Sequence, residues 1–68
     1  MKIILKEDYI KLGQALKAAG LAENGAFAKE VIQDGQVMVN GEVDLRRGRK
    51  LYAGDVVTYN GEEIKIED

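Results

Sequence analysis

The chain has 68 residues, a formal net charge of -2 and a hydrophobic share of 46%. A chain of this length buries one small core, so we expect a single domain over residues 1–68. Because cysteine, histidine and serine are absent, disulfides, thiolate chemistry and hydrolytic triads are excluded, and we expect no catalytic residue, no metal site and no cofactor.

The N-terminal sequence MKIILKEDY contains an apolar run of only three residues between lysines. Such a run is far shorter than the apolar core of a signal peptide or a membrane span. We therefore expect a cytoplasmic protein that does not associate with membranes. The β-branched pair Ile3 and Ile4 favours a short strand from Lys2 to Lys6.

The next segment, from about Tyr9 to Ala19, has the spacing of an amphipathic helix. Its apolar residues fall at i, i+3, i+4 and i+7 and therefore share one face: Leu12, Ala15, Leu16 and Ala19. Asp8 is a suitable N-cap, and Gly20 suits the left-handed position after the last turn. We predict a helix that packs through this apolar face.

A second helix is predicted from about Gly25 to Asp34. Asn24 precedes it as N-cap and Gly35 follows as terminator. Its apolar face consists of Ala28, Val31 and Ile32. Since only the connection Leu21-Ala22-Glu23 separates the two helices, we expect them to pack as an αα-hairpin.

Two β-hairpins are predicted around two Asn-Gly pairs, because Asn-Gly suits the two positive-φ positions of a type I′ turn. In the first hairpin, Val37 and Val39 precede Asn40-Gly41, and Val43 and Leu45 continue the strand pattern. In the second, Val57 and Tyr59 precede Asn60-Gly61, and Ile64 and Ile66 follow. The predicted fold class is α+β, with an N-terminal αα-hairpin followed by a small antiparallel β-sheet.

The segment between the two hairpins, LRRGRKL, concentrates positive charge. Arg46, Arg47, Arg49 and Lys50 fill four of five consecutive positions, while the rest of the chain has six basic and twelve acidic residues. We expect strands at both ends to hold this loop at a defined edge of the sheet. A local positive patch on an acidic protein would bind a polyanion in one orientation.

These elements resemble a known family. The ordered positions that carry the resemblance are Leu12, Leu16, Gly20-Leu21, Ala28-Lys29, Ile32, Gly35, Val37, Val39-Asn40-Gly41 and Gly54-Asp55. Together they resemble the RNA-binding domain named after ribosomal small-subunit protein four, also called the alpha-L motif, over about residues 11–59. The stretches LGQALK and RRGRKLYAGDVV are most similar to the small stand-alone bacterial members of that family.

The resemblance implies non-catalytic binding of structured RNA, either ribosomal or transfer RNA, with ribosomes or ribosome-assembly intermediates as partners. The chain departs from the common family pattern at two positions. Gly25 stands where an Arg is usual, three residues before the alanine that matches Ala28, and Gly13 stands where an acidic residue is frequent. The small stand-alone members share these changes.

The candidate RNA-binding residues follow from charge and from the resemblance. Arginine presents a planar fork of donors that matches phosphate oxygens, and lysine presents a compact charge. The candidates are Arg46, Arg47, Arg49, Lys50, Lys29 and Lys11. Lys29 extends this surface or pairs with a neighbouring acid.

Two further features have two interpretations each. The exposed amides at Asn24-Gly25 either bind a phosphate or form an ordinary helix cap. Tyr52 either stacks on a base or packs at the rim of the core.

Two other classes of function compete with RNA binding. In the first, the basic loop docks on an acidic surface of a protein partner. In the second, the chain is an enzyme, which its poor inventory of catalytic side chains disfavours. We expect the protein to be a monomer, although the edge of so small a sheet offers a place for a second copy to pair.

Overall fold

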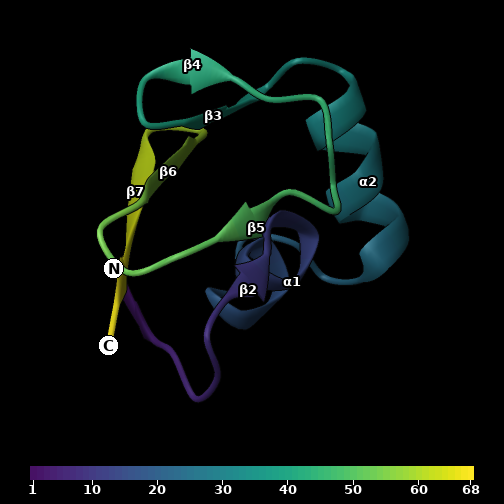
Figure 1. The fold of residues 1–68 in the computed structure, drawn as a ribbon. Coiled ribbons are helices and arrows are strands. Elements are labelled where there is room, and N and C mark those ends of the chain that lie inside the picture. Colours follow the sequence, from purple (N-terminus) through teal and green to yellow (C-terminus); the bar gives the residue numbers. More distant parts are fainter.

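Two helices and seven strands make up the computed structural model, which describes residues 1–68 (Figure 1). In chain order they are β1 (Lys2–Ile4), β2 (Ile10–Lys11), α1 (Leu12–Ala18), α2 (Gly25–Gln33), β3 (Val37–Val39), β4 (Glu42–Val43), β5 (Lys50–Leu51), β6 (Val56–Tyr59) and β7 (Glu62–Glu67). Five strands form one sheet in the order β1-β7-β6-β3-β4, while β2 and β5 form a separate two-stranded ribbon. Neither helix has the length and apolar character needed to cross a membrane.

The five-stranded sheet is mixed, so the prediction of a purely antiparallel sheet is wrong at one edge. β1 runs parallel to β7, with Ile3 opposite Ile66, whereas the other pairs are antiparallel. The helices, the first hairpin, β5 and β6 lie between β1 and β7 along the chain, so no tight turn requires these two strands to be antiparallel. The predicted α+β class and the strand near the N-terminus are confirmed.

Both Asn-Gly turns form as expected. Asn40 and Gly41 have φ values of 53° and 84°, and Asn60 and Gly61 have φ values of 52° and 78°. Positive φ at both central residues defines the type I′ turn, which matches the twist of the flanking strands.

The two hairpins have the same register about their turns, so Val43 occupies the position equivalent to the exposed Glu63. Val57 pairs with Ile64, and both are buried. In the first hairpin Val43 pairs with Met38, which places Val43 on the outer face and leaves it 56% exposed. The strand expected to reach Leu45 ends at Val43. The side chain of the next residue, Asp44, accepts a hydrogen bond from the Arg46 N–H, which turns the chain away from the ladder.

The second helix matches its prediction closely. The Asn24 side chain accepts a hydrogen bond of 2.8 Å from the Phe27 N–H, as an N-cap does. The helix ends at Gln33, and Gly35 has a φ of 80°.

The first helix is shorter than predicted and is not capped by Asp8. It begins at Leu12, and its N-cap residue Lys11 makes no side-chain capping bond. Ile10 and Lys11 instead pair with β5 as strand β2. Long-range pairing therefore overrides the local cap signal. The predicted C-terminal end is confirmed, since Gly20 has a φ of 78°.

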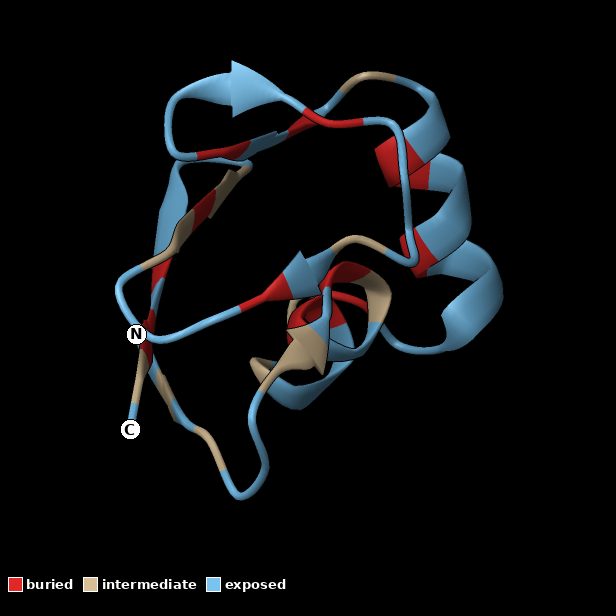
Figure 2. Cartoon of the chain, viewed as in Figure 1, coloured by how far each residue is buried: buried red, intermediate tan, exposed pale blue.

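The core lies between the helix hairpin and the sheets (Figure 2). It consists of thirteen buried aliphatic residues: Leu12, Ala15, Leu16, Ala22, Ala28, Val31, Ile32, Val37, Val39, Leu51, Val57, Ile64 and Ile66. Both predicted helix faces contribute to it. Leu51 is fully buried, so the ribbon of β2 and β5 is joined to the same core as the main sheet.

Candidate nucleic-acid interface

The basic segment, residues 45–51, follows the edge strand β4 and leads into β5, as expected, but its middle lies against the start of α1. The Leu12 N–H donates to the Arg49 carbonyl at 2.8 Å, and the Gly13 N–H donates to the Arg47 carbonyl at 2.9 Å. The first amides of a helix have no partner within the helix. Here the backbone of the basic segment caps α1, which holds the loop in a defined position.

Two of the four cations in the segment are paired with one buried carboxylate. Asp44 is only 6% exposed. It accepts hydrogen bonds from Arg46 Nε at 3.1 Å, Arg46 Nη2 at 2.9 Å and Arg49 Nη1 at 2.7 Å. A further bond of 2.9 Å comes from the Arg46 N–H. The hydrogen bonds from the Arg46 side chain, helped by the Arg46 N–H and by Arg49, hold the pKa of Asp44 well below its usual range despite its burial.

Arg47 makes no ion pair and lines a cleft of about 250 Å³. The cleft lies between one side of α1, the start of α2 and the basic segment. Its lining residues are Lys11, Gly13, Gln14, Lys17, Gly25, Ala28, Arg47 and Gly48. We call it the cationic cleft, because three of these residues are basic and none is acidic.

Both departures from the common family pattern lie in the wall of the cationic cleft. A Cβ on Gly13 would stand 3.5 Å from the Arg47 carbonyl oxygen, an ordinary van der Waals contact, so the basic segment passes close to α1 at this glycine. At Gly25 no atom lies within 4 Å of an added Cβ. The start of α2, where amides without helical partners give a positive end, therefore borders open space.

Lys17 is a cleft residue that the sequence reasoning missed. It is exposed and lies four residues after Gly13 in α1, on the stripe opposite the buried Leu12, Ala15 and Leu16. A side chain at i+4 lies above the one at i on a helix surface. The sequence shows the i, i+4 spacing of Gly13 and Lys17. This spacing indicates a binding residue only once the structure has placed the basic segment beside this stripe of α1.

The structure brings together some of the predicted residues and separates others. Arg47 and Lys11 share the cationic cleft. Lys50 lies directly opposite Lys11 in the ribbon, and its Nζ is 4.8 Å from the centre of the Tyr9 ring. Arg46 and Arg49 gather around Asp44. Lys29 is exposed on α2, one turn after Gly25, and does not line the cleft.

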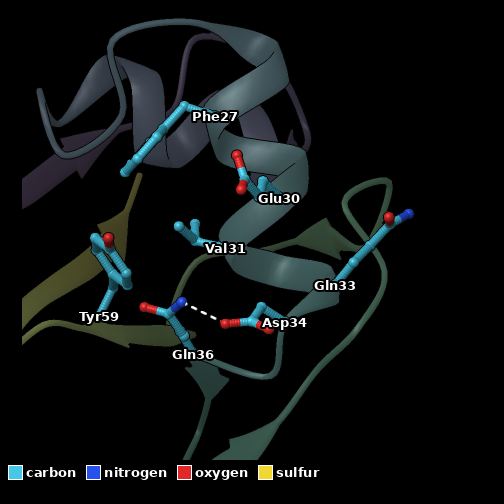
Figure 3. Close-up of a pocket in the computed structure, with 7 residues that line it drawn as sticks. All are labelled: Phe27, Glu30, Val31, Gln33, Asp34, Gln36 and Tyr59. Atoms are coloured by element: carbon cyan, nitrogen blue, oxygen red, sulfur yellow. Dashed lines mark hydrogen bonds between the residues drawn. The ribbon is translucent and has the colours of Figure 1, made fainter.

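A larger hollow of about 500 Å³ lies between α2 and the end of β6 (Figure 3). Glu30 and Asp34 contribute carboxylates to it, and the Gln36 side chain donates to Asp34 at 2.6 Å. These negative charges disfavour phosphate. The hollow uses a different stripe of α2, which includes Phe27 and Val31, from the one that borders the cationic cleft.

Comparison with known proteins supports the resemblance seen in the sequence. The model of the S4 domain family matches residues 3–67. A Bacillus subtilis (strain 168) protein named "Probable ribosome maturation protein RlbA" is 48% identical over 59 residues, which cover 87% of this chain and 83% of the relative.

The protein YbcJ of Escherichia coli (strain K12) is 38% identical over 61 residues, which cover 90% of this chain and 87% of the relative. The solution structure of E. coli YbcJ superimposes with a TM-score of 0.75 and 35% identity, over 98% of this chain and 86% of that one. That structure is described as revealing an alpha-L motif involved in RNA binding. The chain therefore belongs to the S4 domain family.

Proposed function

We propose that this protein binds structured RNA without catalysing a reaction, and that phosphate groups of the RNA enter the cationic cleft. The observation that carries the proposal is the convergence of Lys11, Lys17 and Arg47 on a cleft that has no carboxylate in its lining. When lysine and arginine neutralise phosphates, counterions leave the RNA, and this release supplies a large share of the binding free energy.

The buried Asp44 supports this proposal through the shape of the loop. Its hydrogen bonds to Arg46 and Arg49 order the side chains on both sides of Arg47 and Gly48. Arg47 is then presented to the cleft at little further cost in conformational entropy, as preorganised binding sites require. The exposed part of Arg46 and the nearby Lys50 extend the positive surface beyond the cleft.

The relatives suggest the kind of RNA. One is named a probable ribosome maturation protein, and the YbcJ motif is described as involved in RNA binding. We accordingly propose ribosomal RNA within assembling subunits as the principal target, with transfer RNA as the alternative. Lys29 belongs to this proposed surface as an outer contact, since it lies one turn from the open end of the cleft.

The test is a comparison of two triple variants of equal net charge. Lys11→Ala/Lys17→Ala/Arg47→Ala removes the cationic charges of the cleft. The control Lys2→Ala/Lys6→Ala/Lys65→Ala removes three exposed lysines, none of which lines it. The plot of log K against log salt should become shallower by about 1 for each phosphate that the cleft variant no longer binds.

The control variant should keep most of the affinity of the wild-type protein. Equal reductions in affinity for both variants would show that only net charge matters, which would refute the cleft as the binding site. Co-purification from cells before and after nuclease treatment addresses the competing function. Partners that remain bound after nuclease would favour docking of the basic loop on a protein.

A further inference from the structure

The ribbon formed by β2 and β5 has one buried face and one outer face. Ile10 pairs with Leu51, and Leu51 is fully buried in the core. Lys11 pairs with Lys50 one step along the ladder. Because successive side chains of a strand alternate between faces, the outer face of the ribbon carries Lys11 and Lys50. Tyr9 and Tyr52, which directly adjoin the two strands, continue this face beside Lys50.

The two tyrosines form a pair at one end of this outer face. Their ring centres are 6.0 Å apart and the ring planes are inclined by 59°. Lys50 Nζ lies over the Tyr9 ring at 4.8 Å, within the range of a cation–π contact. Tyr52 is 50% exposed, so it is not packed within the core.

The backbone of Tyr52 is held by a short turn. Its N–H donates to Asp55 Oδ2 at 2.8 Å, and its carbonyl accepts from the Asp55 N–H at 3.0 Å. The exposed ring therefore projects from an ordered segment. An aromatic side chain with two χ angles loses little entropy when it makes a contact from such a position.

We propose that the outer face of the ribbon is a stacking site for one unpaired nucleobase of the bound RNA, with Tyr52 as the stacking residue. The inference rests on the proposed function, because the same strand residue, Lys11, belongs to both the ribbon and the cationic cleft. An RNA backbone that follows Lys11 and Lys50 would bring a base over the tyrosine pair. Aromatic side chains stack on bases in this way in many RNA-binding domains.

The charges around Tyr9 determine which side of the nucleotide, base or phosphate, lies over the tyrosine rings. A hollow beside this ring is lined by Glu7 and Asp8 as well as by Lys11. The two carboxylates repel phosphate, so the sugar-phosphate chain lies on the lysine side and the uncharged base lies over the rings. The ligand class is thus RNA with a bulged or single-stranded nucleotide beside a paired segment, which a continuous duplex does not provide.

The probes are two RNA hairpins that differ only by a single bulged adenosine, measured at low salt. Wild-type protein should prefer the bulged hairpin. Tyr52→Ala should lose about 5- to 100-fold on the bulged hairpin and little on the paired one, and Tyr52→Phe should match the wild type. Tyr52→Leu keeps apolar area without an aromatic face, so it should show the same selective loss on the bulged hairpin. It provides the test if the alanine variant is poorly folded.

Tyrosine fluorescence gives a second, direct readout because the chain has no tryptophan and only three tyrosines. In a Tyr9→Phe/Tyr59→Phe background, the emission comes from Tyr52 alone. The bulged hairpin should quench it and the paired hairpin should not.

Binding of both hairpins with unchanged emission, or equal reductions in affinity for both hairpins in Tyr52→Leu, would overturn the stacking site and leave the cleft proposal standing. Failure of the wild-type protein to bind either hairpin at low salt would overturn both proposals.

Discussion

Asp44 and Arg46 form a bidentate ion pair in which only the carboxylate is buried. Arg46 Nε and Nη2 reach the two carboxylate oxygens at 3.1 and 2.9 Å. The Asp44 side chain is 5% exposed, whereas that of Arg46 is 70% exposed. A buried anion therefore organises a loop whose own charged residues are all cationic. The relationship leads to predictions about both stability and binding.

Asp44→Asn should destabilise the fold. The substitution keeps the shape of the side chain but removes the negative charge of the carboxylate, which accepts hydrogen bonds from two guanidinium groups. Hydrogen bonds to charged groups contribute roughly 1.5–3 kcal/mol, so we expect the free energy of unfolding to fall by about that amount. Urea denaturation measures it. Glu7→Gln, at an exposed residue, is the control and should change stability by less than about 0.5 kcal/mol.

The same carboxylate should make stability depend on acid pH. Arg46 first, and Arg49 as well, lower the pKa of Asp44, so the folded state keeps this group ionised at pH values where the unfolded chain binds a proton. Its contribution is complete above the unfolded pKa of about 3.9 and is lost as the pH falls toward the folded pKa. Below about pH 4, the urea midpoint of the wild type should therefore drop more steeply than that of Asp44→Asn.

Asp55 adds its own acid dependence both in the wild type and in Asp44→Asn. Burial opposes the effect, but the Tyr52 N–H, the Asn40 amide and the charge of Arg49 together lower the pKa of Asp55. Only the difference between wild type and Asp44→Asn reports on Asp44. Parallel curves from pH 6 to pH 2 would contradict the assignment.

Gly25→Glu should separate RNA binding from stability. An added Cβ meets no atom within 4 Å, and an acidic residue in the first turn of α2 interacts favourably with the helix dipole. Stability should therefore stay the same or rise slightly. A carboxylate at the wall of the cleft should nevertheless weaken RNA binding by about 1–2 kcal/mol, or roughly 5- to 30-fold.

Gly25→Gln supplies the matched control, because it has the same shape and no charge. It should bind RNA nearly as well as the wild type, as measured by filter binding or fluorescence anisotropy. Equal affinity of the glutamate and glutamine variants would argue that phosphate does not approach the start of α2.

The two Asn-Gly turns offer a comparison within one molecule. Asn40 and Asn60 share the same backbone conformation, with φ values of 53° and 52°. Only Asn40 also bridges to the next hairpin, where its side chain donates to Asp55 at 3.0 Å and accepts from the Val56 N–H at 2.9 Å. Replacing either by Ala should cost about 1 kcal/mol of backbone strain. Asn40→Ala should cost roughly 1–2 kcal/mol more, because it removes two hydrogen bonds.

Thermal or urea unfolding of the two alanine variants, with the corresponding glycine variants beside them, measures this difference. Glycine relieves the strain at both turns, so Asn60→Gly should be close to the wild type while Asn40→Gly remains destabilised. Similar stabilities for both glycine variants would show that the bridge from Asn40 contributes nothing.

Features that depend on short stretches were predictable. The Asn24 cap, the left-handed Gly20 and Gly35 and the two Asn-Gly turns all rest on interactions within a few residues. Spacing of apolar residues likewise identified the buried faces of both helices. The family resemblance followed from the order of these local signals.

Predictions failed where a distant segment competed with a local one. Asp8 has the chemistry of an N-cap, but β5 pairs with Ile10 and Lys11 and the basic loop caps α1 instead. The parallel pairing of β1 with β7 has no signal in the sequence, since the two strands lie at opposite ends of the chain.

By itself, the sequence determined that the chain forms a helix hairpin and two tight β-hairpins, and that four cations lie between those hairpins. Only the tertiary structure decided which of those cations are neutralised by Asp44, and that Arg47 meets Lys11 and Lys17 around one cleft. The physical reason is how far apart the interacting residues lie along the sequence. Turns, caps and amphipathic spacing depend on neighbouring residues, whereas the balance of charge in a site depends on side chains that folding brings together.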